Sequence, residues 1–146
     1  MEAALRGHSS SGDLPVAYTA YFECFNAGEY YEAHDVLEHL WLGCSTPDAR
    51  FYKGLIQIAG AYVHLKKQFE RPLHPKDGRR LHPAVRLFAL GIANIEPFAP
   101  YHLQLDVAAL INTCRRLANQ IQASQFTQNP WSSDRHPTIT LHNPTP

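Results

Sequence analysis

The sequence has no excess of charge of either sign, because 13 Lys and Arg side chains balance 13 Asp and Glu side chains across 146 residues. A protein that binds nucleic acid needs a basic stripe for the phosphate backbone. The adjacent pairs Arg79–Arg80 and Arg115–Arg116 are too sparse to supply one. We therefore expect no nucleic-acid partner.

Long apolar runs are also missing, since no stretch approaches the roughly 18 residues that a membrane-spanning helix requires. The first residues lack the basic and apolar regions of a secretory signal. The three cysteines, Cys24, Cys44 and Cys114, form no CxxC pair and are odd in number, which indicates free thiols in a reducing compartment. We expect a cytoplasmic protein that does not associate with membranes.

Helical periodicity is the dominant pattern in the rest of the chain. It predicts helices over about residues 16–26, 30–42, 47–67 and 83–95, and a fifth from a cap at Asp106 to about Ala123. Residues 13–123 are therefore predicted to form one all-α domain, a bundle of about five helices. The second and third helices are expected to form a central antiparallel hairpin. Residues 1–12 are predicted to be a flexible arm, and the Pro-, Ser- and Asn-rich residues 124–146 a disordered tail.

The most informative stretch is Tyr30–Trp41, which reads YYEAHDVLEHLW. At about 100° per residue, one face of this helix carries Tyr30, Tyr31, His34, Leu37, Glu38 and Trp41. The opposite side carries Glu32, Asp35 and His39. His34 and Glu38 are thus predicted to lie on the aromatic face that meets the core, where a carboxylate needs a partner.

The long third helix offers that partner. One stripe of it carries Gly54, Gln57, Gly60, Ala61 and His64. Small residues let a neighbouring helix come close, and Gln57 and His64 lie two turns apart on the same stripe. We infer that His34 and Glu38 face Gln57 and His64 across the helix pair, with Trp41 beside them.

Two interpretations of this cluster stay open. In the first, His34, Glu38 and His64 form a buried hydrogen-bonded network, supported by Gln57, which fixes the register of the helices. In the second, the same three side chains bind a divalent metal, with water or Asp35 completing the shell. Imidazole and carboxylate ligands suit Zn, Fe or Mn. Glu38, Asp35 and Glu32 are then the candidate catalytic carboxylates.

Established catalytic motifs do not decide between the two. The stretch contains neither the HExxH nor the HxxEH zinc motif. The di-iron motif ExxH is also missing, because Glu32-x-x-Asp35 and Asp35-x-x-Glu38 have its spacing but end in a carboxylate in place of His. A Gly-rich phosphate loop and a GxSxG elbow are missing as well. Whether the protein is an enzyme therefore stays undecided from its motifs.

Two linked motifs resemble a known family, domain-of-unknown-function family 309. The first motif runs from Phe25 to Trp41 and the second from Phe51 to His64. The family's characteristic polar positions correspond here to Glu32, His34, Asp35, Glu38, Gln57 and His64. The resemblance covers about residues 18–67 and implies a small all-helical protein, of a kind sometimes labelled predicted metal-dependent hydrolases. Asp35 stands where the family usually has Glu, and the Pro-rich residues 71–82 and the tail depart from the family pattern.

Two functions therefore follow as hypotheses. One is a metal-dependent hydrolase in which the metal supplies a water nucleophile at His34, Glu38 and His64. The other is a non-catalytic helical scaffold or binding module in which the same polar residues are structural. A small molecule or a protein is the expected partner in either case, and the sequence leaves open whether the chain forms a homo-oligomer.

Overall fold

Five α-helices make up most of residues 14–142, which is the part of the chain that this computed structural model describes. They are α2 (Val16–Asn26), α3 (Tyr30–Leu42), α4 (Asp48–Glu70), α5 (Leu81–Ile95) and α6 (Val107–Ala123). A 3-10 helix, η2 (Glu96–Phe98), and the antiparallel strands β1 (Tyr101–His102) and β2 (Leu105–Asp106) connect α5 to α6. The predicted all-α class is confirmed. The predicted arm, residues 1–12, lies outside the described residues.

The helix ends follow from local sequence. Gly28, with φ of 77°, adopts the left-handed conformation that ends α2 and turns the chain into α3. The carboxylate of Asp106 accepts a hydrogen bond of 2.9 Å from the amide of Ala109 and caps α6, as predicted. α5 begins at Leu81, two residues earlier than predicted, because Pro83 is tolerated within the first turn of a helix.

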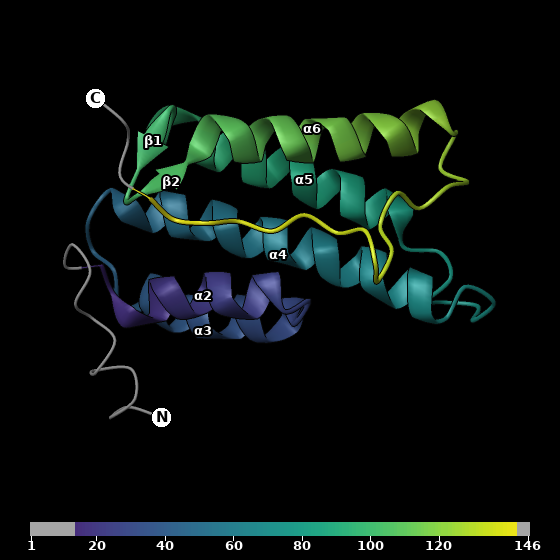
Figure 1. The fold of residues 1–146 in the computed structure, drawn as a ribbon, viewed down its shortest axis with the longest axis horizontal. Coiled ribbons are helices and arrows are strands. Elements are labelled where there is room, and N and C mark those ends of the chain that lie inside the picture. Colours follow the sequence, from purple (N-terminus) through teal and green to yellow (C-terminus); the bar gives the residue numbers. More distant parts are fainter. Residues whose placement is uncertain (1–13, 143–146) are drawn as a thin grey trace.

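The long helix α4 lies in the middle of the bundle. Figure 1 shows α2 and α3 on one side of α4, and α5 and α6 on the other. The predicted antiparallel course of α3 and α4 stays a prediction. No helix within residues 14–142 combines the length and the apolar character that crossing a membrane requires.

An aromatic cluster fills the core between α2, α3 and α4. Tyr62 of α4 stacks on Tyr30 of α3 with ring centroids 5.0 Å apart, and it meets Phe25 and Phe88 edge-on. All four rings are at most 1% exposed. Aromatic pairs of this geometry each add about 0.5–1.5 kcal/mol beyond the burial of their surface. These contacts hold α2, α3 and α5 against α4.

The C-terminal segment, residues 124–142, is where the structure departs most from the sequence prediction. It was predicted to be disordered, yet it runs back along the bundle beside α4 and α6 (Figure 1). Trp131 is buried at 4% exposure and donates a hydrogen bond of 2.9 Å from its indole nitrogen to the hydroxyl of Tyr30. Asn129 donates to the carbonyl of Leu65 at 2.8 Å. The prediction of a disordered tail is wrong for this segment, because its one tryptophan finds an apolar site on the bundle.

Candidate functional site

The face of α3 that meets the core differs from the predicted one. Tyr30, Ala33 and Leu37 are its buried residues, whereas Tyr31 is 61% exposed. His34 and Glu38 lie at the flank of this face and are only half-buried. The helix is therefore rotated so that the small Ala33 packs inward and both ionisable groups keep contact with water, which avoids the cost of desolvation.

The polar groups of α3 make few contacts with one another. Nδ1 of His34 lies 3.4 Å from the carboxylate of its neighbour Asp35, and the His34 ring stacks on Tyr31 at 6.1 Å between centroids. Glu32 and Asp35 are exposed, and Trp41 packs against the core. Glu38 forms no side-chain hydrogen bond with any described residue. An exposed pair such as His34 and Asp35 contributes at most about 1 kcal/mol to stability.

The stripe of small residues on α4 does bring a helix close, but that helix is α5. A Cβ atom added at Gly54 would lie 2.9 Å from the carbonyl oxygen of Gly91 and 2.5 Å from Ile95. On the same stripe, Oε1 of Gln57 accepts a hydrogen bond of 2.7 Å from the amide of Asn94 in α5. The predicted close approach is therefore present, but the prediction that Gln57 faces α3 is wrong.

His64 also turns away from α3. Its Nδ1 lies 3.0 Å from a guanidinium nitrogen of Arg80, in the loop between α4 and α5. Burial lowers the pKa of His64, and the positive charge of Arg80 lowers it further. The neutral ring accepts the hydrogen bond from Arg80, because a guanidinium can only donate.

The predicted metal site is not assembled. Within residues 14–142, no three His, Cys, Asp or Glu side chains are grouped so that they could hold a metal ion. The set is split between two helices, with His34 and Glu38 on α3 and His64 on α4, and Nδ1 of His64 is already hydrogen-bonded to the cation of Arg80. These residues therefore do not fit a Zn, Fe or Mn centre.

The α4–α5 loop holds the best-satisfied charges of the described chain. Asp77, buried at 8% exposure, accepts hydrogen bonds from the side chains of Arg71, at 2.9 Å, and Arg80, at 3.0 and 2.5 Å. The Arg80 hydrogen bond is the main reason that the pKa of Asp77 lies below its usual value. The ring of His74 accepts from the backbone amide of Asp77 at 2.9 Å. This network closes the Pro-rich loop and pairs the charges of Arg71, Asp77 and Arg80 with one another.

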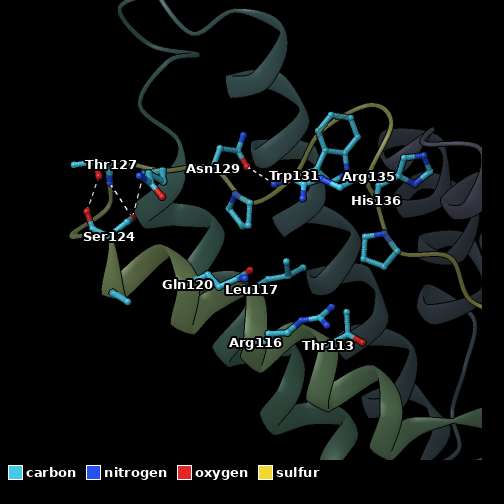
Figure 2. Close-up of a pocket in the computed structure, with 14 residues that line it drawn as sticks. Thr113, Arg116, Leu117, Gln120, Ser124, Thr127, Asn129, Trp131, Arg135 and His136 are labelled. Carbon is cyan, nitrogen blue, oxygen red and sulfur yellow. Dashed lines mark hydrogen bonds between the residues drawn. The ribbon is translucent and has the colours of Figure 1, made fainter.

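An open groove lies between α6 and the C-terminal segment. This α6 groove has a volume of about 1050 Å³. Figure 2 shows its two walls, with Thr113, Arg116 and Gln120 on α6, and Arg135 and His136 on the C-terminal segment. A volume of this size accommodates a drug-sized ligand.

The charge in the α6 groove is of one sign. Arg116 and Arg135 line it, and none of its lining residues is Asp or Glu. Neither guanidinium forms an ion pair or a side-chain hydrogen bond with any residue from 14 to 142. Nδ1 of His136 is buried in the wall, also without a hydrogen-bond partner among these residues, while its ring stacks on Trp131 at 5.9 Å. The groove thus offers unused donors to an anion.

Sequence reasoning missed this groove because it discarded the segment that forms one wall. The available signal was Trp131, a large apolar residue in a stretch that was otherwise polar and rich in proline. The other wall is the polar side of α6, whose apolar side is buried against the bundle.

Residues 18–73 match the model of the family described as Domain of unknown function (DUF309), which confirms the resemblance stated from the sequence. The match runs from α2 through α4 into the loop that follows. No curated protein and no solved structure matches the chain. Both walls of the α6 groove lie outside the matched residues.

Proposed function

We propose that this protein is a non-catalytic binding module that holds an anionic ligand in the α6 groove. The observation that carries the proposal is the pair Arg116 and Arg135, which line one groove without a carboxylate and without an ion-pair partner among the described residues. Guanidinium groups recognise carboxylates and phosphates through paired hydrogen bonds. The polar groups predicted for catalysis are dispersed instead, which favours the binding module over the hydrolase.

The location that we propose for this activity is the cytoplasm. Cys24, Cys44 and Cys114 are all free thiols. Cys114 is buried, and burial raises the pKa of its thiol far above the ordinary value. Free thiols suit a reducing compartment.

Calorimetric titration with inorganic phosphate and with citrate tests the proposal. We expect saturable binding that weakens as salt is added, since exposed charges are screened. Each of Arg116→Ala and Arg135→Ala should weaken binding about tenfold, which corresponds to about 1.4 kcal/mol. Arg79→Ala is the matched control, because Arg79 is equally exposed and lies outside the groove. Equal binding by all four proteins would contradict the proposal.

A further inference from the structure

The α6 groove continues into a second, smaller cavity. This cavity, of about 270 Å³, lies between the first turns of α6 and residues 137–142. Thr113 and Pro137 line both cavities, so the two are joined end to end. Asp106 is the one carboxylate that lines the smaller cavity, and it is engaged in capping α6. The combined cleft is long, with a cationic end and a less polar end, a shape that suits an elongated ligand.

One edge of the C-terminal segment is pinned to the bundle by a single side chain. The amide of Asn26 donates to the carbonyl of Ile139 at 2.7 Å, and the backbone N–H of Ile139 donates back to Asn26 at 2.7 Å. This paired contact is the one that a neighbouring β-strand would make. Ile139 therefore presents both of its backbone groups to α2.

The opposite edge of the same segment is used at one end, where the backbone N–H of His142 donates to the carbonyl of Gln104 at 2.8 Å. In an extended chain, successive residues present their backbone groups to opposite sides. Because Ile139 faces Asn26, the backbone groups of Thr138 and Thr140 face away from it. Neither forms a hydrogen bond with any residue of the described chain. Both residues are exposed, and both line the smaller cavity. Such an edge is a template for strand addition.

We propose that the cleft binds an extended peptide segment of a partner protein, which adds as a strand to Thr138 and Thr140 and places acidic side chains against Arg116 and Arg135. This inference rests on the proposed function, since it names the anion as a peptide carboxylate. The backbone hydrogen bonds supply affinity that is independent of sequence, and the two arginines select acidic residues. Charge complementarity favours this occupant, because the charged side chains that line the larger part of the cleft, Arg116 and Arg135, are both positive.

Fluorescence polarisation with labelled hexapeptides tests this inference on the full chain. The probe carries two glutamates followed by alternating valine and threonine, and it is made in both orientations. We expect binding that weakens about tenfold when the glutamates become glutamines. Methylation of alternate backbone nitrogens of the peptide should weaken binding at least about fivefold, since it removes strand hydrogen bonds. Thr140→Pro, which removes an N–H that the described fold does not use, should have a similar effect while leaving citrate binding unchanged.

The outcomes separate the two proposals. Peptide binding that falls with backbone methylation and with Arg116→Ala supports strand addition. Citrate binding without peptide binding, or peptide binding that is insensitive to methylation, overturns the inference and leaves the anionic groove in place. If neither citrate nor peptide binds, both proposals are wrong. The methylated peptides keep the test decisive should Thr140→Pro fail to fold.

Discussion

The α4–α5 loop and the α6 groove use arginine in opposite ways. In the loop, Asp77 accepts hydrogen bonds from both Arg71 and Arg80, and Arg80 is only 13% exposed in its side chain. In the groove, Arg116 and Arg135 have no acidic partner among the described residues. Charges that satisfy one another fix a fold, whereas charges without partners are available to a ligand. The first region therefore explains why the loop is ordered, and the second where a partner binds.

The groove depends on Trp131, so removing this anchor should have the largest effect. Trp131→Ala is expected to lower the free energy of unfolding by about 3 kcal/mol, because it removes a buried indole and its hydrogen bond to Tyr30. Citrate binding should be lost with it, since one wall of the groove is released. Trp131→Phe keeps most of the packing and should cost about 1 kcal/mol. Urea unfolding measures both, and equal stability of Trp131→Ala and wild type would contradict the order assigned to the segment.

The close contact between α4 and α5 is tested by adding one methyl group to α4. Gly54→Ala should cost about 1–3 kcal/mol, because the new Cβ would lie 2.9 Å from the rigid backbone of Gly91. Gly60→Ala is the matched control, since its new Cβ meets only the flexible end of Leu87 at 3.1 Å. That variant should be much less destabilised, because alanine also raises helix propensity by about 1 kcal/mol over glycine. Thermal melting measures the stability of both variants. A lower melting temperature for Gly60→Ala than for Gly54→Ala would contradict this account of the α4–α5 contact.

Removing one arginine from each region sharpens the comparison. Arg80→Ala leaves the buried Asp77 with a single arginine partner and should lower the melting temperature clearly. Arg116→Ala removes the same charge from an exposed position and should change stability by less than about 0.5 kcal/mol. Citrate binding should be weakened by Arg116→Ala and left unchanged by Arg80→Ala, because only Arg116 lines the α6 groove. A destabilised Arg116→Ala would mean that this arginine has a structural role.

The smallest expected effect is the pH dependence that His64 confers. Burial holds the pKa of His64 in the folded state below its ordinary value of about 6.5, so the unfolded state takes up a proton first as the pH falls. Stability from this group is therefore complete above about pH 6.5 and is lost as the pH falls towards the folded pKa. Urea unfolding at about pH 7.5 and about pH 5.5 should show a smaller decrease for His64→Gln than for wild type. A larger decrease in the variant would contradict the assigned sign.

Most of the fold could be predicted because helix ends are local features. Gly28 and Asp106 end and begin helices through their own backbone and side chain, so their roles are visible in the sequence. The C-terminal end of α4 was harder to predict from the sequence. It continues to Glu70, beyond the predicted end at Lys67, because no strong stop signal precedes the proline at Pro72.

The partners of the polar residues could not be predicted, because they depend on how neighbouring helices are rotated. Periodicity places Gln57 and His64 on one stripe of α4 but does not say whether α3 or α5 packs there. The structure pairs Gln57 with Asn94 and His64 with Arg80, both beyond the motif that suggested them. The α6 groove was still harder to predict from the sequence, because one buried tryptophan brings together residues that are distant in the chain.

The central claim is that Arg116 and Arg135 in the α6 groove receive an anionic ligand. Two-dimensional NMR of the ¹⁵N-labelled full chain, titrated with citrate, tests this most directly. We predict that the largest amide shift changes fall at Arg116, Gln120, Arg135 and His136, with Arg80 and the α3 residues unchanged. Shift changes centred on His34 and Glu38, or no saturable change at all, would contradict the account.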